Sequence, residues 1–324
     1  MRSFNMAMVN RFIIAVDLGG TNLKVALLDL KYRIKDKKVL STKRLIKKEA
    51  LILAIIDSIN KTLENNRLNK ANILGVGLGL PGPIDTERGI VHFFPNIPGW
   101  KEVKLKSILE KKLKLPVFLD NDANMMSLAE YKLGAAQGSK YSVCLTLGTG
   151  VGGGIVIADG LYRGASNAGG EIGHIPINER GPICNCGGRA CLETYIGNNR
   201  ILKEAKRVFK RDISLEELSR LAKGKNRQAL GIWLEVGRRL GIALVGVVNL
   251  LNPECIVIGG GVANAGKMLF DKVREVISKQ AMSVQARRVK VVKAKLGNDA
   301  GLIGAAIFAR ESLLKKYPRN NNAR

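Results

Sequence analysis

The feature that most constrains the fold of this chain is a strand–turn–strand pattern that occurs twice. Residues Phe12–Leu30 and Tyr141–Gly160 each have the pattern of an apolar strand, a glycine-rich turn and a second apolar strand. Asp17-Leu18-Gly19 in the first pattern aligns with Thr146-Leu147-Gly148 in the second. An internal repeat of this kind indicates two related α/β halves.

The two glycine turns favour a nucleotide as ligand. Glycine lets backbone amides approach an anion closely, which suits a phosphate. Neither turn has the GxxxxGK[ST] pattern of a Walker A loop, and neither opens a helix as a dinucleotide fingerprint does. One such turn is weak evidence, because many hairpins contain one. Two matched turns, one following Asp17 and one carrying Thr149, favour a nucleoside triphosphate held between them.

A third glycine turn follows another apolar strand pattern within Glu254–Gly266. A helical pattern follows it at Lys267–Lys279, which places the turn at the carboxyl end of a strand, where ligands bind in α/β sheets. Ahead of it, Arg227–Leu251 has apolar residues mostly at helical spacing, and we expect a long helix with a core-facing side.

Four soft metal ligands are concentrated in one segment. They are His174, Cys184, Cys186 and Cys191. Four nitrogen and sulfur ligands with no open position are typical of a structural zinc site. A disulfide is the weaker interpretation, because Cys184 and Cys186 are too close to pair comfortably and the third cysteine would be left over. Unrelated core cysteines are the plainer alternative. Glu171 and Glu193 bracket the segment, so a metal would hold two carboxylates on a scaffold suited to a ligand rich in hydroxyls.

Carboxylates also occur at a predicted strand-to-helix turn. A short apolar strand at Val117–Leu119 precedes Asp120-Asn121-Asp122, which opens a helical pattern. Helix capping is the ordinary explanation for polar residues there. The position just before the second hairpin also lets Asn121 and Asp122 face a γ-phosphate, where a carboxylate can accept the proton of an attacking alcohol.

Length, composition and charge favour a cytoplasmic globular enzyme. The chain has 324 residues, 46% of them hydrophobic, which is enough for two domains. The first ten residues lack the apolar core of a secretory signal, and no apolar run approaches the roughly 20 residues of a membrane span. Reduced, metal-binding cysteines agree with this compartment.

The formal net charge of +26 raises the possibility of nucleic-acid binding. The basic residues are spread along the chain, however, in short clusters typical of solvated faces. We therefore expect weak, salt-sensitive attraction to polyanions and no specific nucleic-acid partner. The tail Lys315–Arg324 is expected to be disordered.

Six motifs in a fixed order resemble the ROK family (repressors, open reading frames and sugar kinases). They are DLGGTN, LPGPID, NDAN, LGTGVGGG, GGEIGH with its CxCGGRxCLE continuation, and IGGGV. The resemblance runs from Phe12 to about Arg310, and PNIPGW and GPICNCGGRACLE look most like the bacterial glucokinases of the family. The departures are small: Met125-Met126 follows NDAN, where smaller residues are usual, and the high charge and the tail Lys315–Arg324 are not family features.

The resemblance implies the two-domain α/β fold of the actin-like ATPase and sugar-kinase (ribonuclease H-like) superfamily, with the active site in a cleft between domains. The small domain would comprise residues 1–120 and 301–324. The large domain, residues 121–300, would carry the second hairpin, the zinc loop and the adenosine turn. The implied activity is phosphorylation of glucose at its 6-hydroxyl by ATP and Mg²⁺, in a homodimer with structural zinc.

The resemblance also implies a role for each matching residue. Asp122 would be the general base. The sugar would be bound by Gly82, Asn121, Asp122, Glu171, His174 and Glu193. Asp17 would orient Mg²⁺ through water. The phosphates would be held by Gly19, Gly20, Thr21, Lys24, Gly148, Thr149 and Gly150, and adenosine by Gly259, Gly260 and Gly261. Zinc would be held by His174, Cys184, Cys186 and Cys191.

Several alternatives stay open at this point. A repressor of the same family would need a helix-turn-helix domain, and only eleven residues precede Phe12. A non-catalytic sugar sensor would not need Asp122 or both glycine turns. Within the kinases, N-acetylmannosamine, N-acetylglucosamine, fructose, mannose or allose could replace glucose, because one sequence does not show the pocket. Polyphosphate could replace ATP, although the IGGGV turn favours a nucleotide.

Overall fold

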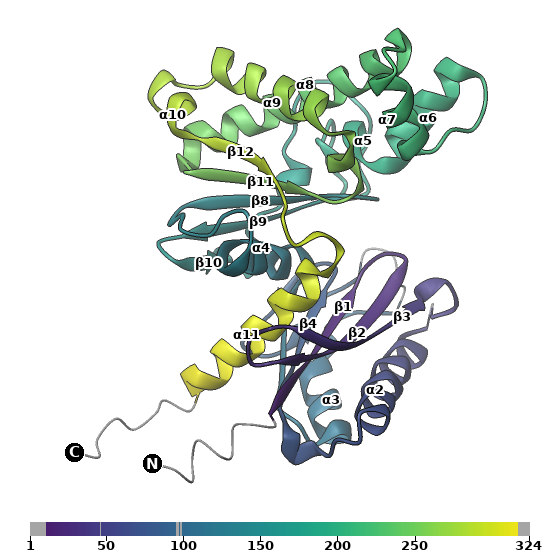
Figure 1. The fold of residues 1–324 in the computed structure, drawn as a ribbon, viewed down its shortest axis with the longest axis vertical. Coiled ribbons are helices and arrows are strands. Elements are labelled where there is room, and N and C mark those ends of the chain that lie inside the picture. The colour runs from purple at the N-terminus through teal and green to yellow at the C-terminus, as the bar shows by residue number, and fades with distance from the viewer. Residues whose placement is uncertain (1–10, 46, 95–96, 98, 317–324) are drawn as a thin grey trace. The chain divides into compact units, whose positions relative to one another are not determined.

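The computed structural model describes residues 11–45, 47–94, 97 and 99–316 as two compact units (Figure 1). The first unit contains the described residues of Met1–Ala129, Gly164–Ala168 and Asp299–Arg324, and the second contains Glu130–Arg163 and Gly169–Asn298. The first ten residues, Pro95, Asn96 and Pro98 of PNIPGW, and residues 317–324 of the tail lie outside the described residues. The predicted domain limits stay a prediction.

The first unit is built on a five-stranded sheet in the order β3-β2-β1-β4-β7. Its strands are β1 (Phe12–Leu18), β2 (Asn22–Asp29), β3 (Ile34–Ser41), β4 (Ile73–Leu80) and β7 (Val117–Asn121). β1, β2 and β3 form an antiparallel meander, whereas β4 and β7 run parallel to β1. Asp17 pairs with Gly79, and Gly79 pairs with Asp120, so the carboxyl ends of these three strands share one edge.

Helices cover both faces of this sheet. They are α2 (Lys48–Asn65), α3 (Leu105–Leu113) and α11 (Ala300–Lys316), and α4 (Asp122–Leu133) begins directly after β7. Ile14 and Val16 of β1 point into the core shared with α2 and α3. α11 lies over the other face of the sheet (Figure 1). On this face, a Cβ added to Gly77 of β4 would collide with the backbone carbonyl of Ala305. Small residues on this face therefore let α11 pack close to the sheet.

The second unit repeats this topology. Its sheet order is β10-β9-β8-β11-β12, with an antiparallel meander followed by two parallel strands. The strands are β8 (Ser142–Leu147), β9 (Val151–Ile157), β10 (Gly160–Tyr162), β11 (Cys255–Gly259) and β12 (Lys290–Lys293). The internal repeat predicted from the two glycine hairpins is confirmed, with β1–β2 matching β8–β9.

The remaining elements surround these sheets. In the second unit they are α5 (Glu193–Ile196), α6 (Asn198–Phe209), α7 (Leu215–Lys223), α8 (Arg227–Leu251), α9 (Lys267–Gln280) and α10 (Ser283–Arg288). Two short strands of the first unit, β5 (Ile84–Asp85) and β6 (Ile90–Val91), form a separate hairpin. Single 3₁₀ turns occur at Thr42–Arg44, Lys70–Asn72, Ile172–His174, Gly261–Ala265 and Gly297–Asp299.

The long helix predicted at Arg227–Leu251 is confirmed with the same limits as α8. Trp233, Leu240 and Leu244 on its inner side are fully buried in the core of the second unit. A buried carboxylate also stabilises this unit: Glu130 accepts hydrogen bonds from the backbone amides of Ala135, Lys295 and Leu296 at 2.7–3.1 Å. Among the residues described, no helix has the length and apolar character needed to cross a membrane.

We expect Gly77→Ala to destabilise the first unit by about 1–3 kcal/mol, because the added methyl group would collide with the Ala305 carbonyl of α11. Gly246→Ala on the exposed side of α8 is the control. No atom lies within 4 Å of its added Cβ, and alanine should stabilise the helix by about 0.5–1 kcal/mol. Thermal melting of the two variants should therefore shift in opposite directions, and equal midpoints would contradict this account of the packing.

Candidate active site

The first glycine turn joins β1 to β2 and is braced from behind. The Gly19 amide donates to the Asn22 carbonyl at 2.9 Å and closes the turn. The Thr42 amide donates to the Thr21 carbonyl at 3.0 Å, and the Thr42 hydroxyl donates to the Gly20 carbonyl at 3.2 Å. No atom lies within 4 Å of a Cβ added to Gly20, so the outer side of the turn is open. A phosphate could approach there.

Asp17 lies just before this turn and is held by an ion pair. Lys24 is its register partner on β2, and Lys24 Nζ donates to Asp17 Oδ2 at 2.8 Å. A Cβ added to Gly301, in the first turn of α11, would lie 2.8 Å from Asp17 Cγ. The amino end of a helix favours a nearby negative charge. Asp17 is therefore a fixed carboxylate beside a candidate phosphate turn.

The second glycine turn is attached to α5 and α6. The Val151 amide donates to Glu193 Oε2 at 2.8 Å, and the Asn198 amide donates to the Gly148 carbonyl at 2.9 Å. A Cβ added to Gly150 would lie 2.5 Å from Glu193 Oε2. The turn and Glu193 are thus in direct contact.

The predicted adenosine turn lies next to the second glycine turn within the same unit. Gly259 ends β11 opposite Thr146 of β8. Gly260 has a φ of +84°, and a side chain there would collide with the Leu147 backbone, so only glycine fits. Gly261 begins the next 3₁₀ turn. A Cβ added to Gly261 would lie 3.9 Å from Asn198 Nδ2. The structure therefore brings together the second phosphate turn, the adenosine turn and the start of α6.

Asp122 is the first residue of α4, directly after β7. Asn121 caps this helix, since its Oδ1 accepts from the amides of Ala123 at 2.9 Å and Asn124 at 3.3 Å. Asn121 Nδ2 donates to the Gly82 carbonyl at 3.1 Å and so holds the Gly82 loop beside Asp122. The capping interpretation of Asn121 is confirmed. Asp122 Oδ1 accepts from the Ala123 amide at 2.8 Å.

Met125 lies beneath Asp122 and is fully buried. Its Cγ is 3.1 Å from a Cβ added to Gly79 of β4, and its backbone carbonyl faces Gly304 of α11. Gly79 leaves room for the Met125 side chain, and Gly304 lets α11 approach the Met125 backbone.

Glu171 and His174 flank a single 3₁₀ turn in the second unit. His174 Nε2 lies 3.9 Å from Glu171 Oε2, and half of the Glu171 side chain is exposed. Partial burial of its carboxyl group raises the pKa of Glu171. The charge of His174 opposes this rise, and the charge of Glu193 adds to it. The predicted sugar-binding residues of the second unit therefore form one acidic group.

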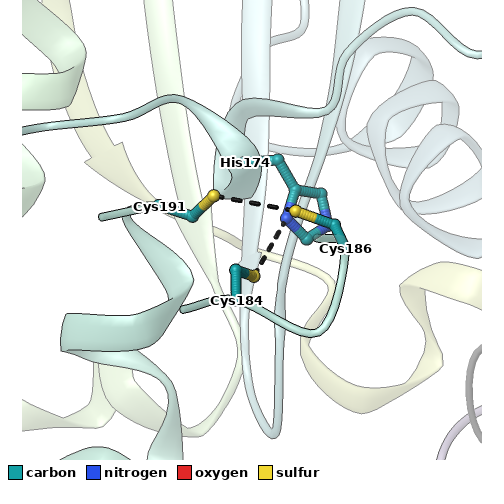
Figure 2. Close-up of side chains that lie close together, drawn as sticks. All are labelled: His174, Cys184, Cys186 and Cys191. Atoms are coloured by element: carbon teal, nitrogen blue, oxygen red, sulfur yellow. Dashed lines mark hydrogen bonds between the residues drawn. The ribbon is translucent and has the colours of Figure 1, made fainter. Parts of the chain in front are cut away.

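The four predicted zinc ligands converge on one point (Figure 2). His174 Nδ1 lies 3.6 Å from Cys184 Sγ, Cys186 Sγ lies 3.7 Å from Cys191 Sγ, and all four ligand atoms lie within 4.8 Å of one another. A tetrahedral zinc ion with bonds of about 2.3 Å to sulfur and about 2.0 Å to nitrogen separates its ligands by about 3.5–3.8 Å. The cluster fits a closed zinc site.

The backbone and the electrostatics of this loop also fit a metal. The Cys184 amide donates to the Gly188 carbonyl at 2.8 Å, and the Gly188 amide donates to Cys186 Sγ at 3.4 Å. This amide lowers the pKa of Cys186, whereas burial raises the pKa of Cys184 and raises that of Cys191 to about 12. Such buried thiols become thiolates when a cation compensates their charge.

The predicted site residues divide between the two units. The first unit assembles Asp17 with the Gly19–Thr21 turn, and Gly82 with Asn121 and Asp122. The second assembles the other phosphate turn, the adenosine turn and the zinc loop with its flanking carboxylates. The glycine turns and Asp122 follow strand ends of their own sheets, whereas the zinc loop and Glu193 lie outside the strands.

Comparison with known proteins decides the family. The ROK family model matches residues 13–312. The chain belongs to the ROK family. It is 36% identical to a glucokinase of Halalkalibacterium halodurans over 94% of this chain and 96% of that protein, and 32% identical to a xylose repressor of Caldicellulosiruptor bescii over 93% and 79%.

Solved structures of ROK proteins share this fold. A ROK family glucokinase from Streptomyces griseus in complex with glucose and AMPPNP aligns with a TM-score of 0.81 and 31% identity, over 93% of this chain and 99% of that one. A ROK hexokinase from Thermus thermophilus aligns with a TM-score of 0.79 and 34% identity, over 94% and 99%. The predicted fold class is confirmed.

Three residues of this ROK chain that help to hold the glycine turns were not predicted from the sequence. Thr42 braces the first turn, and no local pattern marks it. Asn198 bonds the second turn, and its buried Oδ1 has no hydrogen-bond partner among the described residues. Its position at the start of an amphipathic helix was the available signal. The Val151 amide matters only through its contact with Glu193, which no sequence motif encodes.

We expect Cys191→Ser to abolish stoichiometric zinc binding, because one ligand of the tetrahedral set is lost. Cys255→Ser, a buried cysteine outside the cluster, is the control and should retain about one zinc ion per chain. Zinc content by elemental analysis of the purified proteins tests this. Equal zinc in both variants would show that the cluster is not the metal site.

Proposed function

We propose that this ROK protein phosphorylates a hexose at its 6-hydroxyl with ATP, and that glucose is the preferred substrate. The observation that carries the proposal is the arrangement at the start of α4. There Asp122 offers a carboxylate beside the Gly82 loop, which Asn121 holds in place. The glucokinase relative from H. halodurans supports the choice of substrate, and the S. griseus structure with glucose and AMPPNP supports the donor.

Asp122 is the general base of the proposed reaction. Its carboxylate accepts the proton of the 6-hydroxyl as that oxygen bonds to the γ-phosphorus, while the bond from phosphorus to the β,γ-bridging oxygen breaks and ADP leaves. Phosphoryl transfer otherwise depends on positioning and on stabilising charge.

The remaining residues bind and orient the substrates. Asn121, Glu171, His174 and Glu193 would hold the other sugar hydroxyls with the Gly82 loop, and the amides of the two glycine turns would hold the phosphates. Lys24 would add positive charge near the first turn, and Gly259–Gly261 would contact adenosine. Mg²⁺ bound with ATP would neutralise phosphate charge, and Asp17 would hold its water shell. Zinc would be structural, because the cluster supplies all four ligands.

A regulatory sugar-binding protein is the second candidate, because the chain is also similar to xylose repressors. Such a protein would bind sugar without releasing ADP. Kinases for N-acetylmannosamine, N-acetylglucosamine or another hexose differ from the main proposal only in substrate. A cytoplasmic location and a homodimer belong to the proposal as well, and the latter can be tested by sedimentation.

A coupled ADP-release assay with Mg-ATP should show a strong preference for glucose among glucose, N-acetylglucosamine, N-acetylmannosamine, fructose, mannose and allose. A preference for an N-acetylhexosamine would replace the substrate and leave the Asp122 chemistry intact. Sugar binding without ADP release from any of the six would favour the regulator and refute the kinase.

We expect Asp122→Asn to lower kcat about 10²–10⁴-fold while glucose affinity changes by no more than about threefold, because only proton acceptance is lost. Asp85→Asn in the same unit is the control; this carboxylate caps the Arg88 amide and should leave kcat unchanged. Steady-state kinetics and calorimetry with glucose provide the measurements. If Asp122→Asn kept a tenth of wild-type turnover, the assignment of the base would be wrong.

A further inference from the structure

Glu193 lies between the candidate zinc cluster and the second glycine turn. It follows the zinc ligand Cys191 by two residues and begins α5, a single helical turn. Its Oε2 accepts a hydrogen bond from the Val151 amide at 2.8 Å, directly after the Gly148–Gly150 turn. The described residues place no hydrogen-bond donor on its other oxygen, Oε1, which is therefore available to a ligand hydroxyl.

The link between α5 and the phosphate turn has three points of contact. Besides the Glu193–Val151 bond, the Asn198 amide bonds the Gly148 carbonyl, and a Cβ added to Gly197 would lie 2.9 Å from the Thr149 carbonyl. The backbones of the turn and of the α5–α6 junction therefore pack directly on each other. Neither can shift without moving the other, because packed backbone has little room to deform.

We propose that Glu193 is a positioning residue that couples sugar binding to nucleotide binding within the second unit. This inference rests on the proposed function. A sugar hydroxyl on Oε1 fixes the carboxylate, which then holds the Val151 amide and the Gly148–Gly150 turn in the geometry that binds phosphate. The coupling is reciprocal, because each ligand must change the affinity of the other by the same factor.

Gly150→Ala tests the link from the phosphate side. The new methyl group would lie 2.5 Å from Glu193 Oε2 and displace it. We expect the glucose Kd, measured by calorimetry without nucleotide, to rise about tenfold, the value of one hydrogen bond to a charged group. Gly246→Ala, on the exposed side of α8 in the same unit, is the control, because no atom lies within 4 Å of its added Cβ. Its glucose Kd should stay within about twofold of wild type.

The reverse direction is tested at Glu193 itself, with Mg-AMPPNP as the probe and no sugar present. Glu193→Asp is too short to reach the Val151 amide, and the nucleotide Kd should rise about five- to tenfold. Glu193→Gln keeps the length and an acceptor oxygen, so it should bind the nucleotide at least as tightly as wild type. This pair also keeps the test informative if Gly150→Ala does not fold, which zinc content and thermal melting would reveal.

Two results would overturn the coupling. One is a glucose Kd of Gly150→Ala that matches that of Gly246→Ala. The other is an equal nucleotide Kd for Glu193→Asp and Glu193→Gln. If the wild-type protein bound no hexose at all, the proposed function would fail instead. If it phosphorylated glucose while the variant pairs behaved alike, only the coupling would fail.

Discussion

Parallel pairing of strands is the constraint on which the candidate site depends. β1, β4 and β7 run in the same direction, so their carboxyl ends meet at one edge of the first sheet. The Gly19 turn, the Gly82 loop and Asp122 each follow one of these strands. In the second unit, the parallel pairing of β8 and β11 brings the Gly148 and Gly259 turns together in the same way. Each sheet therefore collects functional residues that are far apart along the chain.

The zinc loop is held in place in a different way from the strand ends. Residues 174–191 contain little regular secondary structure, yet they must hold His174 and Glu193 in fixed positions. Four ligands on one ion can replace the missing hydrogen-bond ladder, and structural zinc contributes folding free energy directly. Since α5 starts two residues after Cys191, this order extends to Glu193 and from there to the Val151 amide. The candidate metal cluster, Glu193 and the Gly148–Gly150 turn thus form one connected structure.

Much of the fold could be predicted because its signals are local. The two glycine hairpins, the α8 helix and the His174–Cys191 cluster depend on residue type and spacing over short distances. The structure confirms the hairpins and α8 and brings the four side chains of the cluster together, while their role as zinc ligands stays a prediction. The roles of the site residues could not be predicted as completely. Asn121 was expected to bind sugar, and the structure uses its Oδ1 to cap α4 and its Nδ2 to hold the Gly82 loop. The sugar contact itself stays a prediction.

The sequence by itself determined the class of fold, the repeat, the candidate metal-ligand cluster and the family, because periodicity and motif spacing encode backbone direction and ligand type. Only the tertiary structure decided which groups touch. The contact of Glu193 with the Val151 amide joins residues that are 42 positions apart, and the Gly301 contact with Asp17 joins the last helix to the first strand. Such contacts depend on how sheets and helices pack in three dimensions, and no local pattern of residues specifies them.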